Sequence, residues 1–229
     1  MVLHRLPRTP EPEVMDDELE VEAYRQADFT DVNRRCARRA LRAATAYRCG
    51  DSGGRAIDIG TGPADIPIAL CRLAHGWRVT AVDLSPGMLR VAREHVRAAS
   101  LRSRIRLLRG DAKSLRGVRP PFALVMSNSL LHHLHDPLPF WRQVKRLAGF
   151  HGAIMIQDLC RPESLCQSRA LVRQHTSEES PILQQLFHQS LLAAFTPAEI
   201  RRQLKAVVFP AATVRKINDR HLVVLRRRA

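Results

Sequence analysis

This sequence of 229 residues has no long hydrophobic run. No apolar stretch approaches the roughly 20 residues that a helix needs to cross a bilayer. The first eight residues, Met-Val-Leu-His-Arg-Leu-Pro-Arg, also lack the apolar core of a signal peptide. We therefore expect neither a transmembrane segment nor export. The 45% of hydrophobic residues are still enough for the core of one α/β domain.

Cysteine is scarce and shows no pairing pattern. The chain has five cysteines, an odd number, and none of them stands in a C-x-x-C arrangement. This argues against a disulfide framework and predicts reduced thiols and a cytoplasmic location. Cys71 has apolar neighbours in a helical stretch and is expected in the core. The other cysteines are Cys36, Cys49, Cys160 and Cys166.

Aromatic residues make up only 5% of the chain, whereas its formal net charge is +15. A strongly basic protein is a candidate for nucleic-acid binding. However, side chains that stack on bases are scarce, and the arginines are spread over several helix faces. We therefore do not expect a nucleic-acid partner, and an anionic metabolite or a membrane surface accounts better for the charge. The scattered residues include Arg34, Arg35, Arg38, Arg39, Arg42, Arg90, Arg93 and Arg97.

One segment is more informative than the composition. Residues 55–70 read as a buried strand that breaks into a glycine turn and opens a helix. Gly60 and Gly62 let the backbone turn sharply and approach a ligand. The dinucleotide fingerprint G-x-G-x-x-G is met only in its first two glycines, because Asp65 stands at the third position. A carboxylate there would repel a pyrophosphate, so a phosphate-free cofactor with cationic centres, such as S-adenosylmethionine (SAM), fits better beside Asp58 and Asp65.

Three more expected strands end in polar residues. The strand after Trp77 ends at Asp83, where an acid is placed to accept both hydrogen bonds of a ribose diol. The next strand ends at Asp111, whose carboxylate suits an adenine amino group, and the fourth ends at Asn128. Because helical sequence follows each strand, the pattern predicts an α/β sheet with the site at its carboxyl edge.

These segments, taken in order from residue 55 to residue 158, resemble the class I SAM-dependent methyltransferases. The chain is most similar to the small-molecule branch that includes ubiquinone and menaquinone C-methyltransferases. The resemblance implies an α/β, Rossmann-like, seven-stranded and mostly parallel sheet with an antiparallel last strand, helices on both faces and a helical lid. This sequence departs from the family pattern at Ala64, where many relatives have a third glycine.

The resemblance also implies roles for individual residues. Gly60 and Gly62 would line the methionyl part of SAM, Asp83 would hold the ribose, and Asp111 with Ala112 would hold the adenine. Asn128 would face the methyl-donor region. The complete set expected to bind the cofactor is Asp58, Gly60, Thr61, Gly62, Asp83, Leu84, Asp111, Ala112 and Asn128.

The chain divides into an N-terminal part, residues 1–50, and a SAM-binding methyltransferase domain, residues 51–229. We expect a loose Pro-rich and acidic arm over residues 1–20 and a helical cap over 21–48 that packs on the cofactor edge. A mostly helical insertion at about 159–196 follows the fifth strand. It has more large apolar residues than one helix must bury, so we expect some of them, with Phe187 and Phe195 as candidates, to line an acceptor pocket.

The C-terminal part reads as a helix followed by strands. Thr196 and Glu199 have the spacing of a capping box. Residues 206–209 and 213–217 read as one interrupted strand, and residues 221–226 as its hairpin partner.

Three histidines follow the fourth strand. Because His132 and His133 are adjacent they point in different directions, and no nearby Cys or Glu completes a tetrahedral site, so we expect no metal. Methyl transfer is a direct displacement that depends mainly on alignment, but a hydroxyl or carbon-acid acceptor also needs a base. His133 or His132 is the candidate base, and Asp158 at the tip of the fifth strand is the next. An ordinary core or surface histidine remains the alternative.

The sequence thus predicts an enzyme that moves the methyl group of SAM to a small-molecule acceptor. An RNA methyltransferase is one alternative, and it predicts polynucleotide binding that depends strongly on salt. A non-catalytic SAM-binding partner protein is the other, and it predicts an intact SAM site without turnover.

Overall fold

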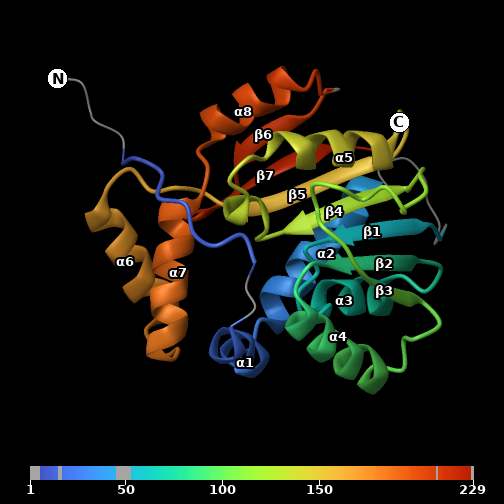
Figure 1. The fold of residues 1–229 in the computed structure, drawn as a ribbon, viewed down its shortest axis with the longest axis horizontal. Coiled ribbons are helices and arrows are strands. Elements are labelled where there is room, and N and C mark those ends of the chain that lie inside the picture. The colour runs from blue at the N-terminus through green and yellow to red at the C-terminus, as the bar shows by residue number, and fades with distance from the viewer. Residues whose placement is uncertain (1–5, 15–16, 45–52, 210, 228–229) are drawn as a thin grey trace.

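The computed structural model describes residues 6–14, 17–44, 53–209 and 211–227 (Figure 1). Its centre is a seven-stranded sheet in the order β3-β2-β1-β4-β5-β7-β6. Six strands are parallel and β7 is antiparallel to both of its neighbours, as the resemblance implied. The strands are β1 Arg55–Ile59, β2 Arg78–Asp83, β3 Ile105–Arg109, β4 Leu124–Asn128, β5 Ala153–Leu159, β6 Thr213–Lys216 and β7 His221–Arg226.

Helices cover both faces of the sheet. On one face α2 (Thr30–Ala44), α3 (Asp65–Leu73) and α4 (Pro86–Ala98) enclose an apolar cluster, and on the other α5 (Leu138–Ala148) and α8 (Pro197–Ala206) enclose a second one (Figure 1). The central strands are buried on both faces, which explains why they read as continuous apolar runs. No helix among the described residues is both long and apolar enough to span a membrane.

The remaining helices gather beyond the carboxyl ends of the strands. The expected cap at 21–48 forms two helices, α1 (Glu18–Gln26) and α2, separated at residues 27–29, and residues 45–48 lie outside the described part. The insertion at 159–196 forms the helix pair α6 (Leu165–Thr176) and α7 (Pro181–Ala193). A short 3-10 turn, η1 (Leu131–His133), follows β4.

Two local predictions were wrong. No helix separates β3 from β4, because residues 110–123 form turns in which Gly110, Gly117 and the pair Pro120-Pro121 interrupt any helical run. Residues 206–209 are not strand either. The capping box at Thr196 starts a helix that continues through Ala206. The helical spacing of its apolar residues places Leu204 in the core, and this packing outweighs the strand preference of the β-branched residues that follow.

The hairpin between the last two strands is confirmed. β6 pairs antiparallel with β7 from Thr213 opposite Leu225 to Lys216 opposite Leu222. In the connecting turn the side-chain oxygen of Asn218 accepts hydrogen bonds from the backbone N–H groups of Arg220 (3.0 Å) and His221 (2.7 Å). This side chain therefore fixes the turn and the register of the pair.

The turn between β1 and α3 has a left-handed backbone at three positions. Gly60, Gly62 and Ala64 have φ values of 72°, 52° and 64°. The N–H groups of Gly60 and Thr61 both donate to the carbonyl of Val82, at 2.8 and 2.9 Å, so the turn is attached to β2. Glycine is required at position 60 for space as well, because a Cβ there would lie 2.8–2.9 Å from Leu130.

Replacing Gly60 by Ala should therefore destabilise the protein by about 1–3 kcal/mol, since backbone strain and overpacking add. Gly62→Ala is the matched control. It has the same left-handed backbone, but its Cβ would meet no atom within 4 Å, so we expect only the strain of about 1 kcal/mol. Urea unfolding of both variants measures the difference, and an equal loss would show that Leu130 moves aside freely.

Candidate functional site

A cavity of about 400 Å³ opens at the carboxyl ends of β1, β2, β3 and β4. Every residue predicted to bind a cofactor lines it except Asp58, namely Gly60, Thr61, Gly62, Asp83, Leu84, Asp111, Ala112 and Asn128. The parallel strands bring these residues together because their carboxyl ends share one edge of the sheet. The other end of the cavity is lined by the α1–α2 junction, η1, α6 and α7.

Asp83 connects the glycine turn to β2. Its Oδ2 accepts a hydrogen bond of 2.7 Å from the N–H of Gly62, and its Oδ1 accepts one of 3.0 Å from the N–H of Ser85. The Ser85 hydroxyl in turn caps α4 by accepting from the N–H of Met88, as its position after the strand suggested. Asp83 thus shapes the cofactor end of the cavity.

Asp58 lies beneath the turn instead of in the cavity. It is buried, and its Oδ2 accepts a hydrogen bond of 2.8 Å from the Thr61 hydroxyl. Burial raises the pKa of Asp58 to about 7, with a contribution from the nearby charge of Asp83 that the Thr61 bond opposes. Its place under the turn makes Asp58 a support for Thr61 rather than a wall of the cavity.

The remaining polar groups at this end are held by their neighbours. Asp111 accepts from the N–H of Lys113 at 2.8 Å. The side-chain oxygen of Asn128 accepts a hydrogen bond of 2.9 Å from the side-chain amide of Gln157. This bond fixes the orientation of the Asn128 side chain at the cavity wall. Asp65, at the edge of the cavity, pairs with His95 at 2.8 Å.

Beside the other end of the cavity lies a buried pair, His132 and Asp158. His132 Nδ1 lies 2.6 Å from Asp158 Oδ1, and the other carboxylate oxygen accepts from the N–H of Leu131 at 2.7 Å. Burial lowers the pKa of His132, but Asp158 and Glu11 raise it more and leave it above its usual value. Burial raises the pKa of Asp158, but His132 and the hydrogen bonds from the backbone N–H groups of Leu131 and Leu159 hold that pKa below its usual range.

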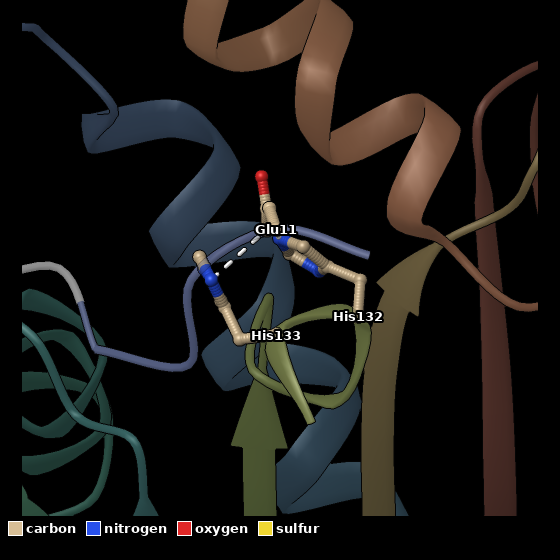
Figure 2. Close-up of side chains that lie close together, drawn as sticks. All are labelled: Glu11, His132 and His133. Carbon is tan, nitrogen blue, oxygen red and sulfur yellow. Dashed lines mark ion pairs between the residues drawn. The ribbon is translucent and has the colours of Figure 1, made fainter. Parts of the chain in front are cut away.

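Glu11 contacts the two histidines of the candidate site, a contact that the sequence did not reveal. It belongs to residues 6–14, which were expected to be a loose arm but are held by hydrogen bonds against α7 and η1. Its Oε1 lies 3.3 Å from His132 Nε2 and 3.2 Å from His133 Nδ1 (Figure 2). No pattern in the sequence signals a contact across more than a hundred residues.

This arrangement changes the argument about metals. The reasoning from sequence found no acid beside the histidines, but Glu11, His132 and His133 have ligand atoms that all lie within 4.8 Å of one another. His133 Nδ1 also lies 3.1 Å from the carbonyl oxygen of Pro12. A ring nitrogen that faces two acceptors is placed as an N–H donor, whereas a metal ligand needs a free lone pair there.

The helical insertion lines the acceptor side only in part. Leu183, Phe187 and Ser190 of α7 line the cavity, as do Tyr24 and Phe29 from the opposite wall. Phe195 does not line it. That ring packs in the core and carries the guanidinium of Arg8 at 4.0 Å from its centroid.

The His132–Asp158 pair predicts a stability that depends on pH. The lowered pKa of Asp158 stabilises the fold above the unfolded carboxyl pKa of about 3.9, and the raised pKa of His132 does so fully below the unfolded imidazole pKa of about 6.5. Asp158→Asn should therefore lower the free energy of unfolding most between about pH 4 and 6.5, by about 3–5 kcal/mol. The loss should become smaller as the pH rises through the folded pKa of His132. Urea unfolding at pH 5.5 and 9 tests this, and equal losses would contradict the ion pair.

Comparison with known proteins adds to this geometry. Residues 56–152 match the family described as Methyltransferase domain. A ubiquinone biosynthesis O-methyltransferase of Xanthomonas campestris pv. campestris is 32% identical over 110 residues, which are 48% of this chain and 44% of the relative. A release factor glutamine methyltransferase of Chlorobaculum tepidum is 41% identical over 75 residues, 31% of this chain and 26% of that one. The chain thus spans less than half the length of these curated relatives.

Among solved structures, the plantazolicin methyltransferase BpumL in complex with SAH superposes with a TM-score of 0.69 over 93% of this chain and 91% of that one. The sequence identity is 12%, so this similarity concerns the fold. The matched domain, the order of the sheet with its antiparallel β7, and the glycine turn attached to β2 agree with one another. Residues 56–152 thus match a methyltransferase domain, and the chain has the fold of the solved methyltransferases to which it is similar.

Proposed function

We propose that this protein transfers the methyl group of SAM to a small-molecule acceptor by direct displacement. The observation that carries the proposal is the cavity itself. One end has the glycine turn and the acids Asp83 and Asp111. The other end combines apolar side chains, such as Tyr24, Phe29 and Phe187, with four histidines, His132, His133, His175 and His221. Such a cavity is within the usual size of small-molecule sites.

The cofactor end suits SAM by shape and charge. Gly62 presents open space where a side chain would stand, so a ligand can approach its backbone. The carboxylates of Asp83 and Asp111 are hydrogen-bond acceptors for a ribose diol and an adenine amino group. SAM supplies an electrophilic methyl group on a sulfonium, and the acids along this end favour a ligand with positive charge.

The acceptor end supports a small molecule over a macromolecule. Glu13 and Val14 of the N-terminal segment, Tyr24 of α1, and Leu183, Phe187 and Ser190 of α7 line this end of the cavity. Residues 6–14 run beside α7 (Figure 1). The names of the two relatives concern a quinone pathway and a protein glutamine, so the matched domain alone does not decide between acceptors. The covered chamber with Tyr24, Phe29 and Phe187 favours a compact molecule with an apolar body.

Among the candidate bases, His133 has the geometry that proton transfer needs. Both ring nitrogens of His132 face carboxylates, and the carboxylate of Asp158 is occupied by His132 and backbone N–H groups. His133 lines the cavity. Burial and the charge of His132 lower the pKa of His133 to about 3, so its ring is neutral near pH 7. Such a ring is a weak base, and it takes up a proton only as the proton of the acceptor becomes acidic during the transfer.

The cofactor assignment predicts that the protein binds SAM and its demethylated product, S-adenosylhomocysteine (SAH), but not NAD. Asp83→Ala should weaken SAM binding at least about tenfold, since charge-assisted bonds to the ribose are lost. Asp83→Asn should weaken it less, because the amide oxygen still accepts from Gly62. Calorimetric titration measures all three ligands and both variants.

Tighter binding of NAD than of SAM would end the methyltransferase proposal. Unchanged affinity in folded Asp83→Ala would leave Asp83 a purely structural role. Binding of an RNA oligonucleotide that falls steeply with salt would favour the RNA methyltransferase alternative. An intact SAM site that turns over none of a panel of hydroxyl, amine and carbon-acid compounds would favour a non-catalytic partner protein.

The acceptor assignment predicts different effects for two phenylalanines. Phe187→Ala enlarges the chamber and should impair use of an apolar acceptor while SAM affinity stays within about twofold. Phe195→Ala is the matched control, because it removes a core ring and should cost about 3–5 kcal/mol of stability. Acceptor screening at saturating SAM with parallel urea unfolding distinguishes them. If Phe187→Ala lowers SAM affinity as much as acceptor use, the ring belongs to the cofactor end.

A further inference from the structure

Residues 6–14 pack against the elements that line the acceptor chamber, and Glu13 and Val14 line the chamber themselves. The N–H of Thr9 donates to the carbonyl of Leu192 at 3.1 Å. The Arg8 guanidinium donates to the carbonyl of Ala193 at the end of α7 (2.6 Å) and to that of His132 in η1 (2.8 Å). Glu13 continues the attachment through Lys113, at 2.5 Å. The segment therefore bridges the insertion, η1 and the loop after β3.

Glu11 lies in the middle of this segment, behind the lining histidines His132 and His133. Its side chain is only 9% exposed, and its Oε1 faces both His132 Nε2 and His133 Nδ1 (Figure 2). The Ser190 hydroxyl of α7 donates to its Oε2 at 3.2 Å. A buried carboxylate is stable only when it is paired, and the His132 imidazolium between Glu11 and Asp158 provides that pairing.

The two ring nitrogens of His133 have different surroundings. Nδ1 lies 3.1 Å from the Pro12 carbonyl oxygen and 3.2 Å from Glu11 Oε1, and both of these are acceptors. Within the described residues no hydrogen-bond partner faces Nε2, and no fully buried side-chain nitrogen is left unpaired, so Nε2 reaches open space at the cavity wall. The proton of the neutral ring belongs on Nδ1, which leaves the lone pair on Nε2.

We propose that Glu11 is a positioning residue, supplied by the N-terminal segment, that fixes His133 in the Nδ1–H tautomer and presents Nε2 to the acceptor. This inference rests on the proposed function. As the acceptor oxygen forms its bond to the methyl carbon, the bond between that carbon and the sulfonium sulfur breaks. Its electron pair remains on sulfur, and the hydroxyl proton of the acceptor passes to Nε2 of His133. Glu11 then faces the imidazolium that forms, as a carboxylate does in a catalytic triad.

A metal ion held by the same three side chains makes the opposite prediction. A divalent cation on Nδ1 of His133 would displace the proton to Nε2 and occupy the lone pair that faces Glu11. The tautomer of His133 therefore distinguishes a positioned base from a metal ligand without any acceptor in hand.

The test is nitrogen NMR of the full chain with 15N-labelled histidine, saturated with SAH at pH 7. We expect the His133 signals, assigned with His133→Gln, to show a protonated Nδ1 and an unprotonated Nε2. In Glu11→Gln, checked for folding by circular dichroism, the Nε2 resonance should shift toward the protonated position. Glu13→Gln is the matched control on the same segment, because Glu13 contacts Lys113 and His135 but not His133.

Several results would overturn the proposal. One is an Nε2–H tautomer in the wild-type protein, and another is a stoichiometric loss of the Nδ1 proton when Zn²⁺ is added. An unchanged His133 spectrum in folded Glu11→Gln would remove the positioning role. SAH affinity and turnover of an acceptor panel, measured on the same samples, separate these outcomes from a failure of the proposed function. That failure predicts either no SAH binding or no turnover by the wild-type protein, whatever the tautomer of His133.

Discussion

The acceptor end of the cavity depends on the buried contact between Asp158 and His132. Asp158 is the last residue but one of β5 and His132 lies in the turn after β4, so the pair joins two neighbouring strands beyond their last shared hydrogen bond. Burial raises the pKa of Glu11, and the facing charge of His132 opposes that shift. Without His132, the buried Glu11 carboxyl would lose the largest interaction that favours its ionised form.

Charge is distributed unevenly between the surface and the cavity. The chain has a formal net charge of +15, yet the cavity is lined by the acids Glu13, Asp28, Asp65, Asp83, Asp111 and Glu179 against the cations Lys113 and Arg220. A low-dielectric cleft strengthens the field of such groups. The acids at the glycine-turn end of the cavity therefore contrast with the net positive charge of the whole chain.

Local patterns predicted the cofactor half of the molecule. Each expected strand from β1 to β5 is present, and the caps at Ser85 and Thr196 form as expected. The errors lie where tertiary context decides. The turns at 110–123 replace a helix, and α8 continues through Ala206 because its apolar period reaches the core. Glu11 was missed since its partners are distant in sequence and its neighbours are prolines and acids, a composition typical of disorder.

Residues 6–14 are ordered by hydrogen bonds to carbonyl groups at the end of α7 and in η1, and their prolines reduce the entropy that ordering costs. The acceptor chamber thus forms only when the insertion, η1 and this segment meet, whereas the cofactor end follows from consecutive strands and turns. The family match agrees with this division, since it covers residues 56–152 and excludes Glu11, Asp158 and α7. Relatives can therefore share the cofactor half while their acceptor chambers, built from long-range contacts, differ.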